Sequence, residues 1–144
     1  MIRHCHPLAR DIRGGTIVEF ALLAPVFLGL LLGVLQIGLG MQSYNALRGV
    51  TADVARNTVV EYQVSNKVSS AQIRQQALAT AIAEPYMLQA DALRVRVSEP
   101  ADQRVDGATE FEMAIEYDVP SVTTLMGFAA PTISYTRPIF VLDD

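Results

Sequence analysis

The feature that most constrains this chain is an uncharged apolar run of 22 residues, Phe20–Met41, close to its N-terminus. A helix of that length extends for about 30 Å, which is enough to cross the hydrocarbon core of a bilayer. Hydrophobic residues make up 51% of the 144 residues, and this run contributes much of the excess. We therefore expect a membrane-spanning helix followed by one polar domain of ordinary size.

The charged residues are divided unequally between the two sides of this run. Positions 1–14 hold three of the eleven Lys and Arg residues but one of the fifteen Asp and Glu residues. The remainder of the chain is therefore acidic, which argues against a nucleic-acid partner because phosphate binding needs a basic surface. Three arginines precede the run and two follow it closely, so the positive-inside rule weakly favours a cytoplasmic N-terminus.

The sequence shows no pattern that is typical of an enzyme or of a metal site. His4, Cys5 and His6 are adjacent, but three neighbours in a tail seldom form a structural metal site, and a single cysteine allows no intramolecular disulfide. Both histidines lie across the expected span from the main domain, so a Ser-His-Asp triad would lack its base. No P-loop, GxGxxG or CxxC occurs. We expect no catalysis, no cofactor, no metal and no small-molecule substrate.

Three interpretations of residues 1–41 are open from these patterns alone. The first is a secretory signal peptide, with Gly38 and Gly40 ahead of a cut before Met41, although the apolar run exceeds the usual length of such a segment. The second is an uncleaved anchor, which explains the run but not Glu19, a carboxylate that is costly near lipid. The third is that a basic leader is removed just ahead of the run.

The segment Arg13-Gly14-Gly15-Thr16-Ile17-Val18-Glu19-Phe20 resembles the processing site of pilins and pseudopilins of the tight-adherence (Tad/Flp) class. In such proteins a prepilin peptidase cuts after a glycine, leaving glutamate at the fifth position and an aromatic residue at the sixth. A cut between Gly14 and Gly15 gives this register, with Glu19 fifth and Phe20 sixth. A cut after Gly15 would place Glu19 fourth, so the Gly14–Gly15 bond is the predicted cleavage site.

The resemblance continues into the helix and points to the TadE-like family of minor pseudopilins. Pro25, the glycine-bounded stretch Gly33–Gly38 and the Ala- and Arg-containing segments Ala46–Arg48 and Val54–Arg56 are similar to that family. Gln36 departs from it, because such proteins often carry an acid at this level.

This resemblance implies a pseudopilin-like structural subunit that a prepilin peptidase processes and that takes part in assembly of a tight-adherence pilus. It implies other pilin or pseudopilin subunits as partners, and a place in the inner (cytoplasmic) membrane with the N-terminus cytoplasmic and a C-terminal head exported. The open alternative is an uncleaved single-pass accessory subunit of another membrane complex.

Two features of the apolar segment suit an assembly role. The resemblance implies that Glu19 pairs with the new amine at Gly15 of an adjacent subunit, and opposite charges ~4 Å apart attract by about 4 kcal/mol at a dielectric of ~20. Small residues also recur every four positions, which can form a packing face between helices in lipid. These residues are Ala21, Pro25, Gly29 and Gly33.

The order of the elements predicts an α+β protein. We divide the chain into a basic leader at 1–14, a transmembrane and continuing helix at 15–62, and an exported head at 63–144. Helical spacing of apolar residues over Ala71–Ala83, ahead of Pro85, predicts one helix in the head.

Three strands are expected to follow this helix and to form a short antiparallel sheet under it. Apolar and polar residues alternate over Leu93–Ser98 and over Glu110–Val119, which predicts two strands joined by a hairpin. The β-rich segment Thr132–Leu142 predicts a third strand, and Pro138 places it at an edge or at a bulge.

The polar faces of the first two strands carry opposite charges, so antiparallel pairing would bring basic and acidic rows together. Arg94 and Arg96 form the basic row. We interpret the acidic row as the solvated face of a half-buried strand and not as a metal or catalytic site. Its members are Glu110, Glu112, Glu116 and Asp118.

Overall fold

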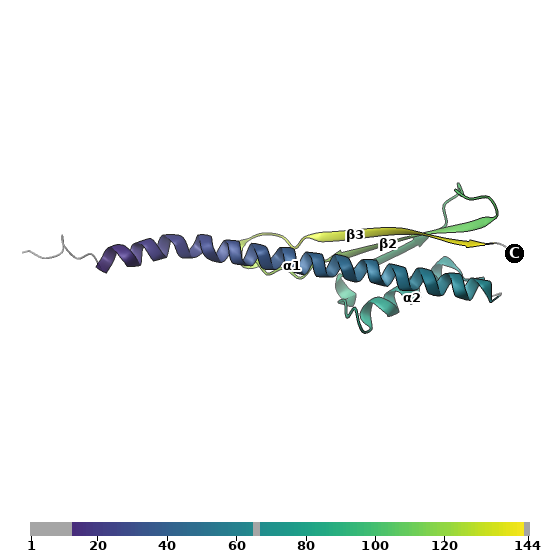
Figure 1. The fold of residues 1–144 in the computed structure, drawn as a ribbon, viewed down its shortest axis with the longest axis horizontal. Coiled ribbons are helices and arrows are strands. Elements are labelled where there is room, and N and C mark those ends of the chain that lie inside the picture. The colour runs from purple at the N-terminus through teal and green to yellow at the C-terminus, as the bar shows by residue number, and fades with distance from the viewer. Residues whose placement is uncertain (1–12, 65–66, 143–144) are drawn as a thin grey trace, which may run out of the picture.

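The computed structural model describes residues 13–64 and 67–142. In this part of the chain, one long helix carries a small head along its C-terminal half, and its N-terminal half projects alone (Figure 1). The head consists of a second helix packed with a three-stranded antiparallel sheet. This arrangement confirms the predicted α+β class.

The long helix α1 runs without interruption over Arg13–Gln63, which is 51 residues or about 75 Å. Its N-terminal half contains the apolar run and, among the described residues, it is the one helix long and apolar enough to cross a membrane. Beyond Met41 the same helix continues into the head, as the helical spacing of its apolar residues predicts. The same helix therefore contains both the exposed apolar run and one part of the head.

The C-terminal half of α1 supplies one wall of the head's core. Leu47, Val50 and Val54 are fully buried, and their spacing of three and four residues places them on one face of the helix. The helix α1 packs mainly on strand β3 (Thr132–Leu142) and also contacts the second helix. The core of the head is therefore built on the same helix that carries the candidate membrane span.

The second helix, α2, spans Ser70–Ile82 and lies between α1 and the first strand. Its start is fixed by a capping box, in which the Gln72 N–H donates to Ser69 Oγ and the Ser69 N–H donates to Gln72 Oε1 at 2.8 Å. Ile73, Ala77 and Ala81 form its buried face. The predicted helix over Ala71–Ala83 is confirmed to within one residue at each end.

The described sheet has the order β1-β2-β3, formed by Leu93–Ser98, Ala108–Asp118 and Thr132–Leu142. Both pairs are antiparallel, and in register Val95 lies opposite Ile115, which lies opposite Tyr135 on the other side. β3 is an edge strand, so the placement predicted from Pro138 is confirmed.

The predicted pairing of opposite charges on β1 and β2 is also confirmed. Both guanidinium Nη atoms of Arg94 donate to the Asp118 carboxylate at 2.8 Å, and Arg96 donates to Glu116 at 2.7 Å. Hydrogen bonds from Arg94 and then from Thr132 lower the pKa of Asp118 to about 2. Exposed ion pairs contribute about 0–1 kcal/mol each, so these pairs favour the register more than they stabilise the fold.

Glu110 corrects one expectation, because it does not lie on a solvated face. Its side chain is only 2% exposed, since the loop between β1 and β2 folds back over it. Arg104 Nε donates to both carboxylate oxygens of Glu110, at 2.8 and 2.9 Å, and Gln103 Oε1 accepts from the Glu110 N–H. The hydrogen bonds from Arg104 lower the pKa of Glu110. The alternation of β2 assigns Glu110 to the polar face correctly, but it gives no information on what covers that face.

A close contact near the middle of α1 holds the head against the helix. The Tyr86 hydroxyl, in the segment after α2, donates to Asp53 Oδ2 at 2.7 Å. The Tyr86 ring also lies so close to α1 that a Cβ added at Gly49 would come within 2.5 Å of its Cε1 atom. Because residue 49 has no side chain, the Tyr86 ring can occupy this space against α1.

We predict that Gly49→Ala lowers the free energy of unfolding by about 1–3 kcal/mol, because the ring must move and its bond to Asp53 is strained. This predicted loss is the net change, after the gain of about 1 kcal/mol that alanine brings to a helix interior. Thermal unfolding of the full chain in detergent micelles, followed by circular dichroism, measures the change. Gly40→Ala is the matched control, since a Cβ there meets nothing within 4 Å. Equal melting temperatures for the two variants would contradict the proposed contact.

Candidate functional site

The predicted cleavage site lies in the first turn of α1, at its free end. Gly14 and Gly15 are both exposed, and a Cβ at either would meet nothing within 4 Å. A protease takes its substrate in an extended form, so this turn has to unwind before cleavage. Each glycine in a helix costs about 1 kcal/mol relative to alanine, and helix ends fray most readily, so unwinding is cheap at this position.

Glu19 and Phe20 follow one turn later on the same bare part of the helix. Every described residue from Gly14 to Leu23 is exposed, and Phe20 is 73% exposed. Within the described residues no Lys or Arg lies within ion-pair distance of Glu19. The carboxylate is therefore available to a group from outside this chain, which is the role the resemblance implies. Arg13 begins α1, and its own role in processing stays a prediction.

The small residues that recur every four positions on α1 differ in their exposure. Ala21 and Pro25 are exposed, whereas Gly29 and Gly33 are half-buried. A Cβ at Gly33 would still meet nothing within 4 Å, so the packing of this chain does not require glycine there. The role of these small residues as a packing face for another helix therefore stays a prediction.

Gln36 makes a contact that the sequence does not predict. Its Nε2 donates to the Pro120 carbonyl at 3.3 Å, and the Val122 N–H donates to its Oε1 at 2.9 Å. Both partners lie in the segment between β2 and β3, more than 80 positions along the chain. The one available signal is the amide itself, since a polar side chain inside an apolar span is expected to have a partner.

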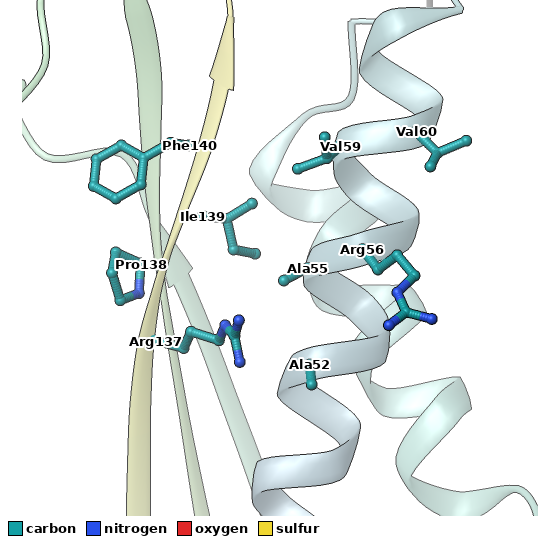
Figure 2. Close-up of a pocket in the computed structure, with 9 residues that line it drawn as sticks. All are labelled: Ala52, Ala55, Arg56, Val59, Val60, Arg137, Pro138, Ile139 and Phe140. Atoms are coloured by element: carbon teal, nitrogen blue, oxygen red, sulfur yellow. The ribbon is translucent and has the colours of Figure 1, made fainter.

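A groove of about 470 Å³ separates α1 from β3 near the far end of the head. In Figure 2, Ile139 projects from β3 toward Ala55 and Val59 on α1, while Arg56 points away from the strand. The two charged side chains that line the groove are Arg56 and Arg137. The groove therefore offers neither a general base nor a carboxylate ligand for a metal, and among the described residues no cluster suited to a metal ion occurs.

Comparison with known proteins gives one finding, and it concerns α1. Residues 14–56 match the family of TadE-like proteins. The match begins at Gly14 and ends within the part of α1 that packs on the head, so α2 and the sheet lie outside it. It confirms the family suggested by the sequence. No curated protein and no solved structure gives a significant match to the chain.

We predict that Gln36→Leu loosens the segment between β2 and β3 without unfolding the head. Each lost hydrogen bond costs about 1 kcal/mol, which corresponds to roughly five-fold faster exchange of the Val122 amide hydrogen. Hydrogen exchange of the full chain in micelles, read at Val122 and at Ile115 in the central strand, measures the effect. Gln42→Leu is the matched control, because Gln42 is exposed on the same helix. Unchanged exchange at Val122 would show that Gln36 does not hold this segment.

Proposed function

We propose that this chain, which is TadE-like over residues 14–56, is a pseudopilin-like structural subunit that takes part in assembly of a tight-adherence pilus. A prepilin peptidase cuts it between Gly14 and Gly15. The observation that carries the proposal is the family match over residues 14–56. It includes Glu19 and Phe20, and the register of these two residues selects the bond after Gly14.

The exposure of α1 supports a function in lipid and among other helices. Nearly all large apolar side chains in its N-terminal half are exposed, including Phe20, Phe27 and Leu31. Such a surface is unfavourable in water, since apolar area costs about 25 cal/mol per Å². A membrane covers it before assembly, and neighbouring subunits take over part of that role in the fibre or at its base.

The proposal gives Glu19 an electrostatic role in this assembly. Cleavage creates an ammonium group at Gly15, and Glu19 of an adjacent subunit pairs with it in a setting of low dielectric. The attraction is partly offset by the loss of hydration. Pairing still disfavours subunits that are shifted along the helix axis, because each shift leaves one buried charge without a partner.

The same proposal sets the location and excludes chemistry by this chain. The protein spans the inner membrane once, with its basic leader cytoplasmic and its head exported. Its partners are the prepilin peptidase and other pilin or pseudopilin subunits. It acts through assembly, and neither catalysis nor a cofactor nor a small-molecule substrate belongs to this function.

The intact mass of the protein purified from membranes separates the possible fates of the N-terminus. We expect a product that begins at Gly15 when a prepilin peptidase is present, and an intact product when it is absent. Gly14→Val should block cleavage, because a branched side chain hinders entry into the protease site. Gly15→Ala should still be cleaved. A product that begins at Met1 in both cases would favour the uncleaved accessory subunit, and one that begins at Met41 would favour secretion.

We predict that Glu19→Ala abolishes assembly with partner subunits while the membrane span is kept. Cleavage and assembly are measured separately, by intact mass and by crosslinking to neighbouring subunits in the membrane. Glu61→Ala is the control, since Glu61 is an exposed acid at the opposite end of α1. Normal cleavage and normal assembly of Glu19→Ala would rule out the role given to this carboxylate.

A further inference from the structure

The segment that joins β2 to β3, residues 119–131 and here called the β2–β3 loop, is unusually apolar for an exposed connection. No charged residue occurs from Val119 to Thr136. Phe128 is 63% exposed, and the residues from Ala129 to Pro131 are exposed as well. The rest of the head carries exposed charges on the sheet, on the β1–β2 hairpin, on α2 and in the segments on both sides of α2, so this loop differs from its surroundings.

The loop is held at its base and along its first half. At the base, the Val119 N–H donates to the Pro131 carbonyl at 3.0 Å, and the Thr132 hydroxyl donates to Asp118 at 2.6 Å. In the first half, Gln36 of α1 bonds to the loop backbone, and the short 3-10 helix η3 (Thr123–Met126) contacts α1 as well. Figure 1 shows the loop extending along α1 past the rest of the head, toward the N-terminus.

This place coincides with the outer end of the apolar run. Gln36 lies 16 residues after Phe20, or about 24 Å along the helix axis, and the run ends about 8 Å further on, at Met41. A bilayer core that begins at Phe20 and is ~30 Å thick therefore ends about 6 Å beyond the level of Gln36, near Gly40.

The charges of the head begin beyond that level. Asp118 ends β2 and pairs with Arg94 on β1. The preceding Tyr117 lines one hollow together with Leu39, Ser43 and Ala46 of α1. The apolar loop therefore lies within the thickness of the expected membrane, and the nearest ion pair lies near its outer limit.

We propose that the β2–β3 loop is a second membrane contact, which lies in the interfacial layer of the outer leaflet with Phe128 directed into lipid. The inference rests on the proposed spanning role of α1, and it adds a surface of the head that lies outside the segment matched by the family. The occupant is a lipid surface, because the loop continues the apolar surface of the spanning helix at the same depth.

The backbone of the loop fits the interface and not the hydrocarbon core. Irregular backbone is not tolerated against lipid tails, where each unpaired polar group costs several kcal/mol. Here the N–H groups of Gly127 and Phe128 donate to the carbonyls of Thr124 and Thr123, and Ser121 and Thr123 share a hydroxyl hydrogen bond. This partial pairing suits a depth of about 5–10 Å, at the boundary of headgroups and acyl chains, where water still reaches the remaining groups.

A second membrane contact restricts the orientation of the head. One spanning helix leaves the subunit free to rotate about the helix axis, whereas a helix and a loop on one side of it fix that rotation. The sheet and the groove between α1 and β3 are then presented in one direction relative to the membrane plane.

The chain contains no tryptophan, so a single introduced indole reports its own surroundings without background. We replace Phe128 by Trp in the full chain, reconstituted in phosphatidylcholine vesicles, and measure emission with and without lipids brominated near the headgroup end of the acyl chain. We expect a shift of the emission maximum to shorter wavelength and loss of most of the emission with brominated lipid. Phe140→Trp, at the distal end of β3, is the matched control and should keep its emission.

Phe27→Trp, in the apolar run, separates failure of this inference from failure of the membrane anchor. Quenching at position 27 but not at position 128 would overturn the loop contact and leave the spanning helix in place. A shift to shorter wavelength at position 128 without quenching by brominated lipid would show that protein covers the loop, which also overturns it. Absence of quenching at both positions would overturn the anchor and the loop contact together.

Discussion

The structure depends on one constraint: a single unbroken helix has to be stable in two different environments. In the N-terminal half of α1 apolar side chains point in all directions, which suits lipid and neighbouring helices. In its C-terminal half the fully buried apolar side chains lie on one face, which the sheet and α2 cover. The change occurs near Gln36–Ser43 without a break in the helix, so one continuous helix connects the candidate span to the head.

It follows that the head cannot be understood as a separate domain on a tether. Its core contains Leu47, Val50 and Val54 of α1, and Tyr86 closes against Gly49 of the same helix. A displacement of the apolar half of α1 is therefore passed directly to the sheet. Such coupling suits a subunit whose proposed role is in assembly.

The elements could be predicted from the sequence because their signals are local. Periodicity gives α2, the first two strands and the second half of α1, while the apolar run gives the first half of α1. The composition of Thr132–Leu142 gives the third strand. The cleavage register rests on a local resemblance between Gly14 and Phe20, and it stays a prediction. The contacts of Gln36 and the burial of Glu110 could not be predicted, because each depends on the position of a loop. For Gln36 this loop is distant in sequence, and for Glu110 it is the neighbouring loop, whose conformation the sequence does not give. The same holds for the apolar β2–β3 loop, because its proposed role follows from its position along the axis of α1, which only the structure gives.

The charges of the chain suggest that insertion depth is set by more than the hydrophobic helix. Glu19 marks one limit of the apolar region, and the Arg94–Asp118 pair marks the other from within the head. Between these limits α1 and the β2–β3 loop form one continuous uncharged surface, since Gln36 uses both ends of its amide on the loop backbone. An amide whose donor and acceptor are both paired costs far less near lipid than a free one. Gln36 is therefore compatible with the candidate span because the loop pairs its amide, and the loop is held beside the apolar run because Gln36 bonds to its backbone.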